Sequence, residues 1–124
     1  KTVVDYRLQR AVESLDAAKI MHKNRMDIFA MNRIYYAMFY AVQALLISEG
    51  VVFSKHGQVK GHFNRVYIKP GIFPLELGRI YNRAFEYRQK FDYMDFAQPE
   101  EETVLQFIGY ATDFLSKVSA HLER

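Results

Sequence analysis

The feature that most constrains the fold is a run of apolar side chains spaced three or four residues apart between residues 28 and 46. This spacing places them on one face of an α-helix, because 3.6 residues complete a turn. Gly50 stands where a glycine C-cap is expected. The sequence therefore predicts a long helix over Asp27–Glu49. Its apolar stripe consists of Ile28, Met31, Tyr35, Phe39, Val42 and Leu46.

Similar patterns and end signals predict four more helices. Thr2 and Asp5 resemble a capping box at the start of a helix that reaches Lys23. A third helix is expected over Lys55–Ile68, loosened by two glycines, Gly57 and Gly61. Pro74 and Pro99 are expected to be the first residues of the fourth and fifth helices, and the fourth ends near Phe91. Acidic residues Glu100, Glu101 and Glu102 suit the start of the fifth.

No alternating apolar pattern bounded by hairpin turns predicts a strand. Long helices joined by short loops favour antiparallel packing. The predicted fold is therefore all-α, an up-and-down antiparallel bundle of about five helices. With 124 residues, the chain is expected to form one domain over residues 1–124.

Composition excludes several classes of function. The sequence contains no cysteine, so disulfides, thiol nucleophiles and cysteine-ligated zinc are ruled out. No uncharged apolar run is long enough to cross a bilayer, and we expect a cytoplasmic protein with no membrane partner. Phosphate-loop, dinucleotide-binding, serine-hydrolase and paired-histidine metal motifs are missing. No cofactor and no metal are therefore expected.

Positive charge is concentrated in the middle of the chain. The formal net charge is +3, but residues 55–90 carry eight Lys or Arg against two acids (8 − 2 = +6), and the remainder carries nine against twelve (9 − 12 = −3). Such a basic segment favours an anionic partner, although a solvated basic face would look the same. His56 and Lys60 lie in this segment and are candidates for contact with a nucleotide or RNA.

The predicted second helix also carries a polar and aromatic seam beside its apolar stripe, formed by Asn32, Tyr36, Tyr40 and Gln43. Buried amides and phenols need hydrogen-bond partners. The seam is therefore interpreted as an interface, either with neighbouring helices or with a second copy of the chain.

Arg88 is anomalous because it shares the apolar stripe of the predicted fourth helix with Leu77, Tyr81 and Ala84. An arginine near a core is costly unless it is paired. Asp92, four residues later, is the nearest partner. One interpretation is a structural Arg88–Asp92 ion pair, and the other is a cationic group held at a cleft for phosphate.

Several segments, in this order, resemble proteins of the HEPN-domain family. They are residues 32–41 (NRIYYAMFYA), 44–46 (ALL), 56–57 (HG), 63–71 with its IKPG ending, and 88–93 (RQKFDY). The likeness covers nearly the whole chain and is closest to small, stand-alone prokaryotic members of largely unassigned activity.

The resemblance implies a helical bundle that forms a homodimer, together with a partner, a minimal nucleotidyltransferase, in a toxin–antitoxin-like pair. In catalytic branches of this family, an arginine followed within about a turn by a histidine forms a metal-independent RNase site at the dimer interface. In one branch, the partner modifies a nearby tyrosine with AMP.

Arg88 matches the family arginine, but the histidine is missing and Asp92 stands near its place, followed by Tyr93. An aspartate with a pKa near 4 is a poor proton donor at neutral pH. The first hypothesis is therefore a nucleotide- or RNA-binding partner protein, with Tyr93 as a modification target. The second is an RNase that combines Arg88 with His56 or Tyr93. The third is a structural module in which Arg88 and Asp92 only form an ion pair.

Overall fold

A computed structural model describes residues 2–123, and within them it contains helices but no strand. The α-helices are α1 (Val3–Lys23), α2 (Asp27–Ser48), α3 (His56–Phe63), α4 (Leu75–Tyr93) and α5 (Glu101–Leu122). A short π-helical segment, Asn64–Ile68, continues α3. The predicted all-α fold class is thus confirmed.

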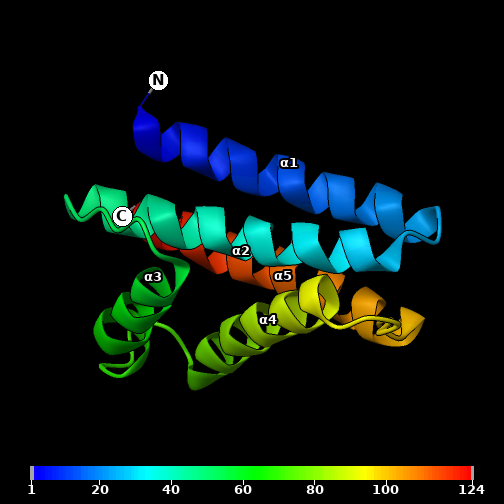
Figure 1. Ribbon diagram of the computed structural model, residues 1–124. Coiled ribbons are helices and arrows are strands. Elements are labelled where there is room, and N and C mark those ends of the chain that lie inside the picture. Colours follow the sequence, from blue (N-terminus) through cyan, green and yellow to red (C-terminus); the bar gives the residue numbers. More distant parts are fainter. Residues whose placement is uncertain (1, 124) are drawn as a thin grey trace.

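Helix α2 is the centre of the bundle (Figure 1). Helix α1 runs antiparallel along one side of it, α5 lies behind it in the view, and α3 and α4 lie on the side opposite α1. Contacts join α2 to each of α1, α3, α4 and α5. Most α2 side chains are consequently buried, including Met31, Ile34, Tyr35 and Met38 at 0% exposure. Only a narrow strip of α2 reaches the surface, and the seam residues lie on that strip.

Two helix ends show the predicted chemistry. At the start of α1, the Thr2 side chain accepts a hydrogen bond from the Asp5 N–H, and the Asp5 carboxylate accepts one from the Thr2 N–H, which completes a capping box. After α2, Gly50 has a φ of +78°. Side chains with a Cβ rarely adopt this conformation, so a glycine suits the end of this helix.

The expected loosening of the third helix at its glycines is wrong. Gly57 and Gly61 lie inside regular α3, and the irregular part is the π segment that follows, in which the Lys69 N–H donates to the Asn64 carbonyl at 2.8 Å. A tertiary contact holds this segment. Asn64 Nδ2 lies 3.0 Å from Asn82 Oδ1 on α4, so the segment is tied to the neighbouring helix.

Close packing of α4 against the π segment also depends on a glycine. A Cβ at Gly78 would lie 2.9 Å from Asn64 Oδ1 and 3.0 Å from Ile68 Cγ2. Real Cβ atoms almost never approach other atoms this closely. Gly78 therefore permits the approach that sets α3 and α4 side by side.

Both prolines stand just before their helices and not at the first helical position. Pro74 is the N-cap of α4, with an extended ψ of 148°. Glu100 is the N-cap of α5 and is still extended, with ψ 138°, so α5 begins two residues after Pro99. Helix α4 continues to Tyr93, two residues beyond the expected end, because the Met94 N–H still donates to the Lys90 carbonyl. No helix within residues 2–123 is long and apolar enough to cross a membrane.

Candidate functional site

Arg88 reaches from α4 onto the aromatic surface of α2. Its guanidinium carbon lies 5.1 Å from the ring centre of Tyr35 and 5.4 Å from that of Tyr36. The Arg88 side chain is 17% exposed, and its neighbours on the same stripe of α4, Tyr81 and Ala84, are fully buried. A cation on the faces of two tyrosine rings is attracted by their π electrons, which partly offsets the cost of its burial.

The carboxylate beside Arg88 compensates its charge only in part. Asp92 Oδ2 lies 3.5 Å from Arg88 Nε, close enough for an ion pair but too long for a good hydrogen bond. Arg88 Nε is buried and has no hydrogen-bond partner. The same Asp92 oxygen is 3.4 Å from Asn32 Nδ2, so it is shared between two donors. A buried donor without a partner is costly, and the charge of Arg88 is left only partly compensated.

His56 joins this cluster from the first turn of α3. Its ring stacks on Phe39, with centroids 4.1 Å apart and planes at 6°, and its Nδ1 lies 2.7 Å from the Tyr35 hydroxyl. Burial and then the charge of Arg88 lower the pKa of His56, and burial raises the pKa of Tyr35 well above its usual value. At pH 7 Tyr35 is therefore a neutral phenol and His56 a neutral imidazole, joined by one hydrogen bond.

The other two candidates for nucleotide contact lie in different surroundings. Lys60 follows His56 by four residues on the same face of α3, and its Nζ lies 4.7 Å from the ring centre of Phe85, which in turn contacts Tyr35. Tyr93 is 77% exposed at the end of α4. Tyr93 follows Arg88 by five residues, and this spacing on a helix separates the two side chains by about 140° around the helix axis. No ring contact or hydrogen bond within residues 2–123 joins Tyr93 to Arg88.

The seam on α2 carries two arginines that sequence reasoning missed. The guanidinium of Arg33 lies 4.8 Å from the ring centre of Tyr36, and that of Arg10, on α1, lies 5.4 Å from the ring centre of Tyr40. The spacing of Arg33 and Tyr36, three residues apart on a helix, is a signal that could have found the first pair. Arg10 has no local signal because its contact depends on how α1 packs.

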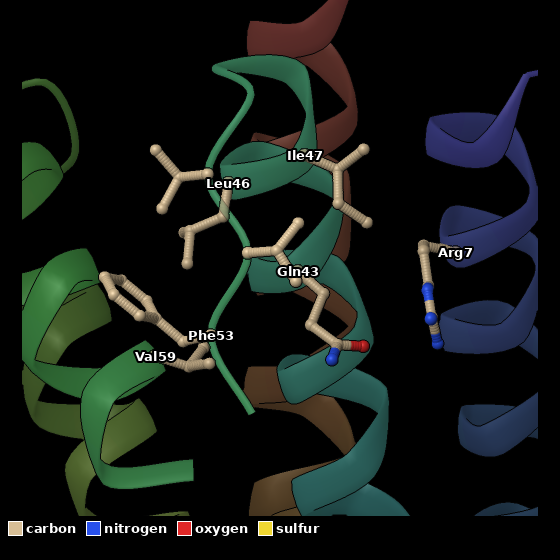
Figure 2. Close-up of a pocket in the computed structure, with 8 residues that line it drawn as sticks. Arg7, Gln43, Leu46, Ile47, Phe53 and Val59 are labelled. Atoms are coloured by element: carbon tan, nitrogen blue, oxygen red, sulfur yellow. The ribbon is translucent and has the colours of Figure 1, made fainter. Parts of the chain in front are cut away.

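Gln43 lies apart from the Arg88 cluster. Its side chain points toward Arg7 across a small cavity of about 50 Å³ that is otherwise lined by apolar side chains (Figure 2). Gln43 Oε1 and Arg7 Nε are both buried without a hydrogen-bond partner. The four seam residues thus split: Asn32 and Tyr36 contact the Arg88 cluster, Tyr40 lies beneath Arg10, and Gln43 lines the separate cavity.

The remaining histidines lie outside this cluster. His22 Nδ1 lies 2.8 Å from Asp27 Oδ1, and His62 Nε2, which is buried without a hydrogen-bond partner, lies 3.5 Å from Glu49 Oε1. The His121 ring contacts the rings of Tyr67 and Phe73. In the part of the chain that the structure describes, no three His, Asp or Glu side chains gather closely enough to hold a metal ion.

Comparison with known proteins gives the family. The HEPN domain model matches residues 4–121, which is nearly all of the chain. The chain belongs to the HEPN domain family. One relative is a "UPF0332 protein" of Thermotoga maritima, 45% identical over 98% of this chain and 92% of its own length.

Two further relatives of this HEPN chain are archaeal proteins. "Putative toxin MJ0142" of Methanocaldococcus jannaschii is 32% identical over 93% of this chain and 78% of its own length. "Putative toxin MJ0605" of the same organism is 31% identical over 94% and 86%. The resemblance inferred from residues 32–46 and 88–93 is therefore confirmed at the level of the family.

The Arg88 cluster, formed by Arg88 and His56 with the rings of Tyr35, Tyr36 and Phe39, combines three kinds of group. Arg88 supplies a poorly compensated cation, His56 a neutral imidazole, and Tyr35, Tyr36 and Phe39 supply flat apolar faces. A partly compensated cation suits a phosphate, and of the three rings only the half-buried Tyr36 reaches the surface, because Tyr35 and Phe39 are buried.

Proposed function

We propose that this HEPN protein binds a nucleotide or RNA at the cluster of Arg88, His56, Lys60 and the α2 tyrosines, as the partner of a minimal nucleotidyltransferase in a toxin–antitoxin-like pair. The observation that carries the proposal is the incomplete pairing of Arg88, whose buried Nε lacks a hydrogen-bond partner 3.5 Å from Asp92. A phosphate at the exposed part of the Arg88 side chain, which is 17% exposed, would complete the compensation of its charge.

Direct binding tests this proposal. The probe is a fluorescein-labelled single-stranded RNA of about eight nucleotides, within the usual site size of proteins that bind single strands, with AMP as a competitor. Arg88→Gln is expected to weaken RNA binding at least about tenfold, because a charge-assisted phosphate contact is lost. Arg83→Gln is the matched control, since Arg83 also lies over a tyrosine ring, that of Tyr87, but outside the cluster. Equal affinity of Arg88→Gln and wild type would refute the proposal.

The partner and the modification rest on the family and on the toxin names of the two archaeal relatives. Tyr93 is 77% exposed, as a hydroxyl modified by another enzyme must be. Co-expression with a minimal nucleotidyltransferase encoded beside this gene, followed by intact mass, is expected to give a complex and an AMP adduct that Tyr93→Phe lacks. A complex without an adduct would leave the pairing in place and remove the role of Tyr93.

We also propose that the protein forms a homodimer. Light scattering tests this by measuring its molar mass in solution. Contact through the seam would bring Arg10 and Arg33 of one copy near the same residues of the other, which like-charge repulsion disfavours. If the seam is nevertheless the interface, Tyr40→Glu is expected to give monomers. A dimer that persists in this variant would assign the contact to another surface.

A second candidate function is metal-independent RNA cleavage with Arg88 and His56. It is favoured by the neutral imidazole of His56 beside the cation, since a neutral imidazole can take up a proton at pH 7. This function predicts cleavage in the presence of EDTA that is lost in His56→Gln and kept in Tyr93→Phe. RNA that stays intact with wild type would exclude it and leave binding as the function.

A further inference from the structure

A hollow of about 160 Å³ opens between α1 and α2 on the far side of Tyr36 from α4, and two arginines line it. Arg10 comes from α1 and Arg33 from α2, and Glu13, Ser14 and Ala17 complete the wall. None of these residues belongs to the Arg88 cluster. The hollow therefore offers a second place at the surface where an anion could be bound.

Each arginine of the hollow rests on a tyrosine ring of α2. Arg33 lies over Tyr36 at 4.8 Å and Arg10 over Tyr40 at 5.4 Å, and the two ring centres are 5.8 Å apart, about one helical turn. A guanidinium held over a ring loses less freedom when it binds an oxyanion than a free side chain would. The two rings under the cations are thus about one turn apart along α2, and both cations line the same hollow.

Hydrogen bonds connect this hollow to the Arg88 cluster. Arg33 donates from Nε and from Nη2 to Asn32 Oδ1, at 3.3 and 2.9 Å. Asn32 in turn donates to Asp92, the ion-pair partner of Arg88. Asn32 therefore orients a cation on each side of itself, and the ring of Tyr36 contacts both guanidinium groups.

Acidic groups at the hollow do not neutralise it. Glu13 is the one carboxylate among its lining residues, and it accepts a hydrogen bond from Gln9 on its own helix at 3.3 Å. Two cations against one carboxylate leave a positive surface.

We propose that Arg10 and Arg33 form a second phosphate-binding subsite, so that the ligand is a single-stranded RNA whose backbone crosses α2 from Arg88 to Arg10. The inference rests on the proposed function at Arg88 and specifies its ligand. A mononucleotide has no phosphate to place at both ends of this row, whereas a strand places successive phosphates along it. The arginines cover the rings of Tyr36 and Tyr40, so the strand is held through its phosphates and not by stacking of its bases.

The salt dependence of RNA binding tests the subsite. Each phosphate contact in a single strand contributes about 0.7 to the slope of log affinity against log salt. Removing both arginines, in Arg10→Gln/Arg33→Gln, is expected to lower the slope by about 1.4 and to weaken RNA binding at least about tenfold. AMP, which reports on the Arg88 cluster alone, is expected to compete with its wild-type affinity.

The control is a double variant with the same loss of charge elsewhere, Arg79→Gln/Arg83→Gln on the exposed side of α4. Since Arg33 also holds Asn32, the single variant Arg10→Gln isolates the subsite, with an expected loss of about 0.7 in slope. Glu13→Gln, which removes the carboxylate, is expected to tighten RNA binding.

The outcomes separate the two proposals. If Arg10→Gln and the double variant bind RNA like wild type while Arg88→Gln does not, the subsite is refuted and the proposed function stands. If Arg88→Gln also binds like wild type, both are refuted. If the control variant Arg79→Gln/Arg83→Gln loses as much RNA affinity as Arg10→Gln/Arg33→Gln, the effect is due to net charge and the subsite is refuted.

Discussion

Whether Arg88 serves binding or stability can be decided by a double-mutant cycle with Asp92. The variants are Arg88→Met, which keeps the length of the apolar stem, Asp92→Asn and the pair together. If the structural hypothesis holds, removing one partner costs about 3–5 kcal/mol of the free energy of unfolding, because the other charge is left buried. If Arg88 is held for an anion, its contribution to stability is small.

The geometry sets the expected coupling. Two unit charges 3.5 Å apart attract each other by ~1.2 kcal/mol at the dielectric constant of water and by ~4.7 kcal/mol at an effective value of ~20. The side chains are 17% and 28% exposed, so solvent screens the pair, and their desolvation opposes the attraction. We therefore expect a coupling of about 1 kcal/mol, with each single variant folded.

Urea unfolding followed by circular dichroism measures all four proteins. A difference in the denaturant midpoint at constant slope reports the change in stability, and the cycle isolates the pairwise part. A coupling above about 3 kcal/mol would refute the reasoning, because it would make Arg88 and Asp92 a pair on which folding depends. A small coupling, with loss of RNA binding in Arg88→Met, would support a functional arginine.

Two further predictions concern packing and pH. Gly78→Ala is expected to lower the free energy of unfolding by about 1 kcal/mol, because the crowding of the new Cβ costs about 1–3 kcal/mol and exceeds the gain in helix propensity. The control is Gly109→Ala in α5, where a Cβ meets nothing within 4 Å. Urea unfolding should show that this control raises stability. The lowered pKa of His56 means that the unfolded chain binds more protons just below pH 6.5, so stability falls as the pH drops from 7 toward 5. His56→Gln should lose less stability over this range, and an unchanged pH profile would contradict the assignment.

Much of the fold could be predicted because its signals are local. Helical periodicity, the capping box at Thr2 and the glycine after α2 act within one or two turns of the chain. The same is true of Arg88 and Asp92, four residues apart on one helix face. Local spacing was therefore enough to place this pair together.

What the sequence did not reveal depends on how helices cross. The hydrogen bond between Tyr35 and His56 joins residues on α2 and α3, and Arg10 meets Tyr40 only because α1 lies along α2. Likewise, the π segment is tied to α4 by the contact of Asn64 with Asn82, 18 residues away, and the nearby glycines give no sign of that contact. The stripe position of Tyr35 predicts a core residue and gives no sign that its hydroxyl reaches a histidine.

The tyrosines of α2 explain how one central helix can build both core and site. A tyrosine ring packs like an apolar group while its hydroxyl remains available to a polar partner. Tyr35 has no exposed surface, yet it bonds His56 and lies under Arg88. Tyr35 under Arg88 is thus part of the core, whereas Tyr36 and Tyr40, under Arg33 and Arg10, are half-buried and pack against it. Changing the guanidinium groups leaves these rings in place. Substitutions at these arginines should therefore alter binding more than stability, and removal of the Tyr35 ring should alter both.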